Sequence, residues 1–228
     1  MKYKRLIYSQ NPLELRQTQP FAEGGNRLCF VHPDDNNLCI KVTKPDAIVR
    51  LRAKKSFLKQ LKPASYFDDN LNEYNAYQQP AIQNGGADIY SHIPHCYGWQ
   101  ETDLGAGLVS DYYSDDDKVP CKTLRQILQA HGYSEEIETK LHQLADYLRE
   151  TQLLTKNILP HNVVLAADGR LKIIDGIGAP SAFNIARFSK IARAHYIERR
   201  IARMFLRMAW EVSDKSRTWE ATEKSGTV

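Results

Sequence analysis

The chain has 228 residues, of which 42% are hydrophobic and 25% are charged, the composition of an ordinary soluble protein. No run of about 18 apolar residues occurs, so we expect no membrane-spanning helix. The net charge of +4 is too small to demand a nucleic-acid partner. The four cysteines form no Cys-x-x-Cys pair, so reduced thiols and a cytoplasmic location are expected.

A glycine turn and a strand lysine stand near the start of the chain. Gly24 and Gly25 separate two apolar stretches within residues 21–31, a pattern that predicts a turn between strands. Backbone N–H groups beside glycines can approach phosphate oxygens closely, and Lys41 on the expected strand 38–42 would add a positive charge. An ordinary hairpin turn and a solvated lysine are the alternatives.

A helix is expected over residues 69–77, where Asp69 can cap the first turn. The apolar residues of this segment would share one helix face: Leu71, Tyr74 and Tyr77. Glu73 on the same helix is the expected partner of Lys41. The alternative for Glu73 is an ordinary surface position.

The middle of the chain predicts a change from strands to helices. Residues 105–109 form an apolar strand candidate, and residues 114–120 after them are a polar linker. A capping box at Thr123 opens a helix that ends near His131, and Ser134 caps the next helix. The second helix carries an apolar stripe of Ile137, Leu141, Leu144 and Leu148.

Two short apolar runs within residues 159–176 predict a β-hairpin, because Asp168-Gly169 between them is a favoured hairpin turn. The hairpin would place Asn162 and Asp175 at neighbouring strand ends. Amide and carboxylate oxygens are hard donors that suit Mg²⁺ and a bound triphosphate. The sequence therefore predicts a magnesium and nucleotide site at these two residues.

The chain has two segments that are rich in basic residues, at 47–62 and at 187–208. The first has six basic side chains and no acid, and the second has seven basic side chains against Glu198. The second segment can form a helix whose apolar face would consist of Ile191, Ala192, Ala194, Tyr196, Ile201, Met204, Phe205 and Met208. A solvated basic face is the simplest interpretation, and binding of a phosphorylated or anionic partner is the alternative. Stacking aromatics are too sparse there for a strong nucleic-acid signal.

The order of these features resembles that of protein kinases: glycine turn, strand lysine, helix glutamate, asparagine, and strand-end aspartate. The resemblance implies an α+β, protein-kinase-like two-lobed fold. Residues 1–110 would form a β-rich N-lobe with helices around 47–79. Residues 111–211 would form a truncated helical C-lobe that contains the hairpin 155–176, and residues 212–228 would be a flexible tail.

The same resemblance implies ATP and Mg²⁺ as cofactors. Nucleotide contacts are implied for Gly24, Gly25, Arg27, Lys41, Glu73, Asp111 and Tyr112, the last two in a hinge that pairs with adenine. Metal contacts are implied for Asn162 and Asp175, and catalytic roles for Lys41, Asp175 and Asn157.

The sequence departs from the kinase pattern at two places. Only Gly24 of the glycine turn stands at an expected glycine, and Arg27 occupies the position of another. The catalytic aspartate should stand five residues before Asn162, where this chain has Asn157. Because an amide cannot accept a proton at neutral pH, we expect an aspartate introduced at this position to preserve or raise any transfer.

A narrower resemblance covers roughly residues 10 to 180. The chain is similar to the bacterial YrbL-like family, known as PhoP regulatory network proteins. The residues that carry the likeness are Arg27-x-Cys29-Phe30-x-His32-Pro33-x-Asp35, Cys39-Ile40-Lys41 and Pro160-x-Asn162-Val163-Val164. The likeness implies a protein-kinase-like fold and leaves the activity open.

Three functions follow as expectations. The first is an atypical ATP- and Mg²⁺-dependent phosphotransferase, and the short chain after Asp175 favours a small molecule, sugar or lipid headgroup over a protein as acceptor. The second is a pseudokinase that acts as a regulatory or interaction module. The third is a basic adaptor that binds polyanions through a helix at 187–208.

Overall fold

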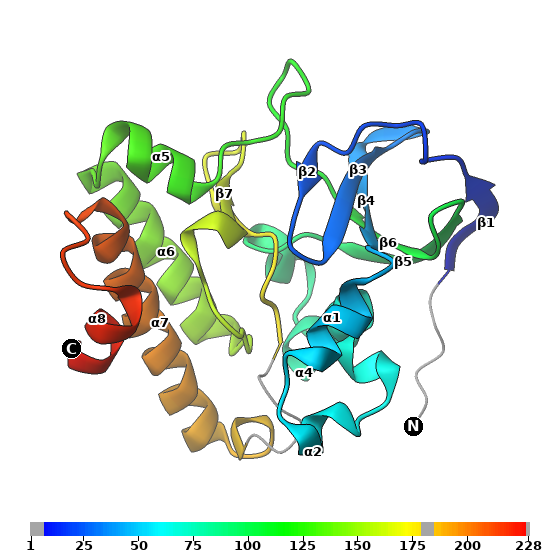
Figure 1. Ribbon diagram of the computed structural model, residues 1–228. Coiled ribbons are helices and arrows are strands. Elements are labelled where there is room, and N and C mark those ends of the chain that lie inside the picture. The colour runs from blue at the N-terminus through cyan, green and yellow to red at the C-terminus, as the bar shows by residue number, and fades with distance from the viewer. Residues whose placement is uncertain (1–6, 179–184, 227–228) are drawn as a thin grey trace. The chain divides into compact units, whose positions relative to one another are not determined.

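A computed structural model describes residues 7–178 and 185–226 of the chain (Figure 1). It contains both helices and strands, so the mixed α+β composition predicted from the sequence is confirmed. The described residues divide into two compact units. The first unit lies within Met1–Asn75 and Pro94–Pro120, and the second within Ala76–Ile93 and Cys121–Val228.

This division differs from the expected boundary at residue 110, because the segment Ala76–Ile93 belongs to the second unit. Its end is hydrogen-bonded to the predicted hairpin: the Ile173 N–H donates to the His92 carbonyl over 2.8 Å. The Tyr147 hydroxyl also donates to the Ile89 carbonyl over 2.6 Å. These bonds between distant parts of the chain were not visible in the local sequence pattern.

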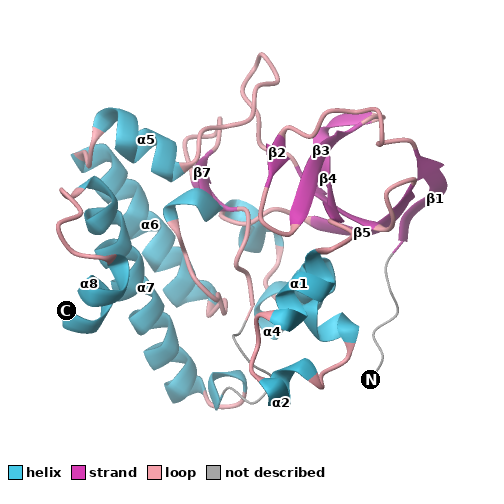
Figure 2. Ribbon diagram, viewed as in Figure 1, coloured by secondary structure: helices cyan, strands magenta, loops and turns pink. Residues whose placement is uncertain are grey.

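The first unit is built on a six-stranded sheet, drawn in magenta in Figure 2. Its strands are β1 (Ile7–Leu13), β2 (Ala22–Glu23), β3 (Arg27–His32), β4 (Asp35–Thr43), β5 (Cys96–Thr102) and β6 (Gly107–Asp111). The spatial order is β1-β5-β6-β4-β3-β2. Strand β1 pairs with β5 in parallel, and the other neighbours are antiparallel.

Both faces of β4 are buried, and successive side chains alternate between them. One face joins the main core cluster of Leu15, Phe30, Leu38, Ile40, Val42 and Val109. Gly107 on β6 fits under this cluster, because a Cβ there would lie 2.3 Å from the Ile40 Cγ2 atom. The opposite face carries Lys41, so the lysine predicted on this strand is a buried residue.

Four short helical segments complete the first unit: α1 (Ala47–Ala53), α2 (Phe57–Gln60), the 3-10 helix η1 (Ala64–Phe67) and α3 (Asp69–Ala76). Helix α3 agrees with the helix predicted over residues 69–77. It packs on the sheet through Tyr74, whose ring centroid lies 5.9 Å from that of Trp99. The basic segment 47–62 forms α1 and α2, which expose several apolar side chains as well: Val49, Phe57, Leu58 and Leu61.

The second unit is mainly helical, as the cyan ribbons of Figure 2 show. Its longer helices are α5 (Leu124–His131), α6 (Glu135–Thr151) and α7 (Lys190–Val212). The shorter elements are α4 (Pro80–Gln83), η2 (Ala87–Ser91), η3 (Pro160–Asn162), β7 (Val163–Leu165), β8 (Leu171–Ile173), η4 (Ile185–Arg187) and α8 (Trp219–Ser225). None of the helices in the described ranges is long and apolar enough to cross a membrane.

Local sequence signals placed α5 and α6 correctly. Thr123 forms the predicted capping box with Gln126, and Gly132 follows the last residue of α5. The Ser134 hydroxyl accepts from the Ile137 N–H at the start of α6. All four residues of the predicted apolar stripe on α6 are buried.

Helix α7 differs in part from its prediction. It is a helix as expected, but Ile191, assigned to the apolar face, is 85% exposed, and Ala194 is also exposed. The predicted face residues Ile201, Met204 and Met208 are buried, as expected, and Ile197 and Glu211 are buried beside them. The helix thus begins as an exposed segment and becomes part of the core only from its second turn onwards.

The segment expected to form a flexible tail, 212–228, contains α8 in its described part. Thr218 caps this helix through its hydroxyl. Trp219 packs against Trp210 of α7 with a ring-centroid distance of 6.0 Å, and Glu223 pairs with Arg203 over 2.9 Å. Tryptophan packing and an ion pair therefore connect α8 to α7.

Candidate functional site

A buried ion pair joins a strand and a helix of the first unit. Lys41 lies on β4 and Glu73 on α3, and the Lys41 Nζ atom donates to Glu73 Oε1 over 2.6 Å. Their side chains are only 8% and 5% exposed. The pairing predicted from the sequence is therefore confirmed, and the surface alternative for Glu73 is wrong.

Arg27 on β3 completes a charged cluster around Glu73. Its guanidinium pairs with the second carboxylate oxygen of Glu73 and donates to the Asn70 amide oxygen over 3.4 Å. The Asn70 amide nitrogen donates to the Lys41 carbonyl over 2.7 Å. Arg27 was expected to contact phosphate at the glycine turn, but its side chain points to Glu73 in this structure.

The electrostatics of Glu73 reflect these two cations. Burial would raise the pKa of its carboxyl, but the charges of Lys41 and Arg27 outweigh that effect and lower the pKa to about 2. Glu73 is therefore ionised throughout the physiological range. The three side chains of Arg27, Lys41 and Glu73 together carry two positive charges and one negative charge.

The glycine turn is a tight hairpin between β2 and β3. The Gly24 N–H donates to the Arg27 carbonyl over 2.9 Å, and the Arg50 guanidinium donates to the Gly25 carbonyl. A Cβ at Gly25 would meet no atom within 4 Å. The backbone at Gly25 therefore faces open space, and its role in phosphate binding stays a prediction.

Asp111 and Tyr112 at the end of β6 make contacts within the first unit. The Asp111 carboxylate accepts from the His95 N–H over 2.8 Å and from the Tyr97 hydroxyl over 2.7 Å. The Tyr112 N–H donates to the Asn37 carbonyl over 2.7 Å, and its ring packs on Phe21. An adenine bound at this predicted hinge would have to use other groups or exchange these bonds.

The hairpin of the second unit places Asn162 and Asp175 close together. The two strands pair Val163 with Ile173, and the Ile174 N–H donates to the Asn162 carbonyl over 2.9 Å. The Asp175 carboxylate accepts from the Gly176 N–H over 2.7 Å. Their amide and carboxylate oxygens suit Mg²⁺, with water or phosphate supplying further ligands. Within the part of the chain that the structure describes, no cluster of three His, Cys, Asp or Glu side chains forms a metal site.

Asn157, at the position expected for a catalytic base, is bound by two arginines of α7. Its Oδ1 atom accepts from Arg203 over 2.8 Å and from Arg200 over 3.1 Å. The loop around it is fixed as well, because the Lys156 N–H donates to the Gly176 carbonyl over 2.6 Å. The Tyr196 hydroxyl donates to the Thr155 carbonyl over 2.8 Å. Asn157 thus braces the loop against α7.

Sequence reasoning missed the residues that surround the predicted ones. Asn70 was treated as a helix cap, although its side chain binds the backbone of Lys41. Arg200 and Arg203 were counted as part of a basic helix face. Their spacing of three residues on one helix was a signal that both could reach a common acceptor.

These residues lie in a protein of mixed α+β class with a buried Lys-Glu pair in one unit and an Asn/Asp hairpin in the other. Residues 13–209 match the family described as PhoP regulatory network protein YrbL, and the chain belongs to that family. The family expected from the sequence is thereby confirmed.

Two relatives illustrate the similarity. The chain is 27% identical over 187 residues to a protein of Escherichia coli (strain K12) that is named uncharacterized protein YrbL. The alignment covers 78% of this chain and 79% of that protein. A protein of Shigella flexneri with the same name matches over the same lengths and with the same identity.

Proposed function

We propose that this protein is an atypical kinase-like phosphotransferase that uses Mg²⁺ and ATP and acts on a small molecule, a sugar or a lipid headgroup. The observation that carries the proposal is the buried pair of Lys41 and Glu73. Burying charges is costly, and a well-packed apolar pair is often at least as stable. A buried Lys-Glu pair on a strand and a helix is the arrangement by which kinase-like enzymes hold a lysine for nucleotide phosphates.

The proposed roles follow the residues predicted from the sequence. Lys41 contacts phosphate and Glu73 orients it, while Arg27 is a second cation beside them. Asn162 and Asp175 are the proposed ligands of Mg²⁺, which would neutralise phosphate charge. The adenine side is assigned to Asp111 and the backbone around it, and the glycine turn at Gly24 and Gly25 ends two residues before Arg27.

A second candidate function is a pseudokinase that binds nucleotide and regulates a partner. The specific observation in its favour is the double hydrogen bond from Arg200 and Arg203 to Asn157. The loop residues 155–159 contain no carboxylate, so they supply no general base there. Under this function, nucleotide binding would occur without transfer to any acceptor.

Binding is tested by calorimetry with Mg²⁺-ATP on wild type, Lys41→Met and Asp175→Asn. Methionine keeps the length of the lysine side chain without its charge, and Glu73 retains Arg27 as a partner. We expect at least about tenfold weaker binding for Lys41→Met, because a charge-assisted contact to phosphate is lost. The exposed Lys54→Met is the matched control and should bind as wild type does. Equal affinities of Lys41→Met and wild type would contradict the assignment.

Transfer is tested with γ-labelled ATP and a panel of small hydroxyl-bearing acceptors, with water as the reference acceptor. The phosphotransferase proposal expects label on an acceptor with wild type and a loss of label with Asp175→Asn. If wild type binds nucleotide but labels no acceptor, the pseudokinase function replaces it. If neither binding nor transfer occurs, both candidates fail.

A further inference from the structure

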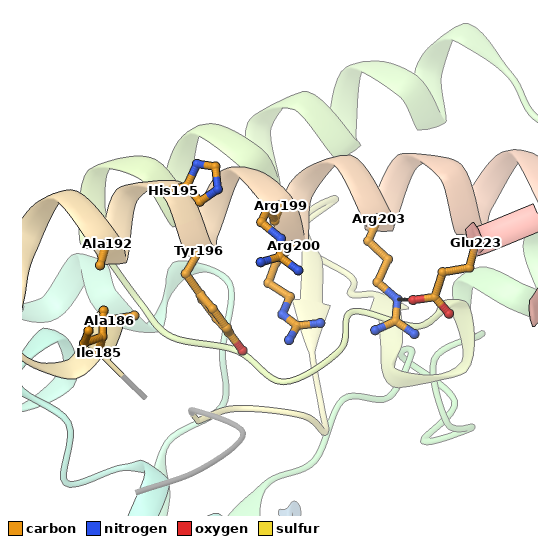
Figure 3. A pocket seen from close by; sticks show the side chains of 9 residues that line it. All are labelled: Ile185, Ala186, Ala192, His195, Tyr196, Arg199, Arg200, Arg203 and Glu223. Carbon is orange, nitrogen blue, oxygen red and sulfur yellow. Dashed lines mark ion pairs between the residues drawn. The ribbon is translucent and has the colours of Figure 1, made fainter. Parts of the chain in front are cut away.

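A cavity of about 470 Å³ lies along one side of α7 in the second unit (Figure 3). It is lined by Ile185, Ala186, Ala192, His195, Tyr196, Arg199, Arg200, Arg203 and Glu223. Figure 3 shows Tyr196, Arg200 and Arg203 extending from the same side of the helix. The volume falls within the range of about 300–1,000 Å³ that is usual for small-molecule sites.

The charge in this cavity is not balanced. Arg203 is paired with Glu223 over 2.9 Å. Among the residues that the structure describes, neither Arg199 nor Arg200 has a carboxylate within ion-pair distance. Arg200 instead contacts the neutral amide of Asn157 and lies over the Tyr196 ring, 4.7 Å from its centroid. Two positive charges therefore remain uncompensated at one end of the cavity.

A second cavity of about 640 Å³ adjoins the first at Arg203 and adds to the positive charge. Its basic residues are Arg203, Arg207, Lys215 and Arg217, and Glu220 is the acid among its lining residues. Two of these cations, Arg207 and Lys215, lie over the Trp210 ring at 4.3 and 5.3 Å. Arg207 and Lys215 share the carboxylate of Glu211, each at 3.7 Å, and Arg203 is paired with Glu223. Four cations therefore stand against Glu211, Glu220 and Glu223, and the positive charge that is left over favours an anion in the first cavity.

We propose that the first cavity binds a small molecule bearing a phosphomonoester or diphosphate group, at a site separate from the proposed nucleotide site. Two guanidinium groups match a phosphate dianion in charge, and each can donate two parallel hydrogen bonds to its oxygens. The other end of the cavity is apolar, with Ile185, Ala186 and Ala192. That end suits a ring or short hydrocarbon attached to the phosphate, next to Tyr196.

The ligand would also compete with Asn157, in the loop 155–159 of the second unit, for the Arg200 guanidinium. A phosphate oxygen is a stronger acceptor than the amide oxygen of Asn157, so it would take the Arg200 guanidinium from that residue. Arg203 would keep Asn157 in place, because its own charge is already balanced by Glu223. Binding of the ligand therefore removes Arg200 from Asn157 and leaves the hydrogen bond from Arg203 to Asn157 intact.

The test is calorimetry with sodium pyrophosphate in the absence of divalent cations, at about 50 mM salt so that screening is moderate. The variants are Arg199→Gln and Arg200→Gln. Arg199 is exposed, and its side chain makes no hydrogen bond or ion pair within the described part of the chain, so its variant should fold as wild type does. The control is Arg170→Gln in the turn between β7 and β8, which removes the same charge from an exposed position of the second unit outside the cavity.

We expect wild type and Arg170→Gln to bind pyrophosphate with equal affinity, and each cavity variant to bind about tenfold or more weakly. Glycerol 3-phosphate should bind in the same way, whereas succinate at equal ionic strength should bind clearly more weakly. Lys41→Met should bind pyrophosphate as wild type does, which separates this site from the nucleotide site.

The proposal is overturned if wild type does not bind pyrophosphate, or if Arg170→Gln weakens binding as much as the cavity variants. Equal binding of succinate would overturn the preference for phosphate. Binding only to vesicles that contain phosphatidic acid, without binding of soluble phosphates, would assign the charge to a lipid surface and overturn the small-molecule site.

Discussion

Replacing Glu73 with glutamine should destabilise the first unit by several kcal/mol. The substitution keeps the size of the side chain but removes the carboxylate that pairs with Lys41 and Arg27, whose side chains are 8% and 12% exposed. Breaking a buried pair by removing one partner typically costs about 3–5 kcal/mol. The lowering of the Glu73 pKa from 4.5 to about 2 gives a similar value of about 3 kcal/mol.

The assay is denaturant unfolding followed by tryptophan fluorescence. The chain has three tryptophans, and Trp99 is the one that lies in the first unit, packed against Tyr74 of α3. Replacing Trp210 and Trp219 by phenylalanine leaves Trp99 as the reporter. The control is Glu101→Gln, an exposed residue on β5 that should change the unfolding free energy by less than about 0.5 kcal/mol.

The pH dependence of the unfolding free energy gives an independent check that the ionised form of Glu73 stabilises the fold. Because the folded pKa of Glu73 is lowered, its stabilisation is present above pH 4.5 and is lost as the pH falls towards 2. The stability gap between wild type and Glu73→Gln should therefore be full at pH 7 and close between pH 4.5 and 2. A gap of less than about 1 kcal/mol at pH 7, or one that widens in acid, would refute the reasoning.

Three further predictions concern local features. Thr123→Ala removes the capping box of α5 and should lower the unfolding free energy of the second unit by about 1 kcal/mol, measured by denaturant titration. Gly176→Ala should cost more than about 1 kcal/mol in the same titration, because Gly176 has φ +97° and a Cβ would lie 2.7 Å from the Asn157 carbonyl oxygen. A glycine-to-alanine change at Gly25 is its control, since that position is open. Burial raises the pKa of Cys39 to about 11 and the pKa of Cys96 to about 12. Both thiols should therefore react with a disulfide reagent at pH 8 only after denaturation. Rapid reaction of both thiols in the native protein would contradict this prediction.

The sequence predicted best the features that depend on neighbouring residues. The ends of α5 follow from Thr123 and Gly132, and the start of α6 follows from Ser134. The hairpin follows from the Asp168-Gly169 turn, where Gly169 has φ +76°. In each case the signal is a capping or turn residue within four positions of the element that it ends.

Contacts between distant residues were harder to predict. The Lys41–Glu73 pair was expected because the order of motifs resembles that of kinases, which supplies long-range information. Nothing in the sequence placed Arg27 on the same carboxylate, 46 positions earlier in the chain. Arg27 stands close to two glycines in sequence, and it was therefore expected to bind phosphate. The local sequence does not show whether the side chain of a strand residue points towards a helix that packs on the sheet.

The face of α7 was predicted only in part for a similar reason. Its first turn has apolar residues at helical spacing, and such a pattern predicts burial only if a neighbouring element covers it. The structure buries the later positions, including Ile197, which the predicted face omitted. The tryptophans that bind α8 to α7 are likewise 9 positions apart in sequence and meet only when the chain turns back between them.

The hydrogen bonds of Asn157 change the effect that we expect from an aspartate introduced at this position. From sequence alone, an aspartate at this position seemed able to restore a general base. In the structure, a carboxylate there would lie between Arg200 and Arg203, which hold the present amide at 3.1 and 2.8 Å. Two cations at that distance would stabilise the ionised form and weaken it as a proton acceptor. Asn157→Asp should therefore stabilise the loop without raising transfer.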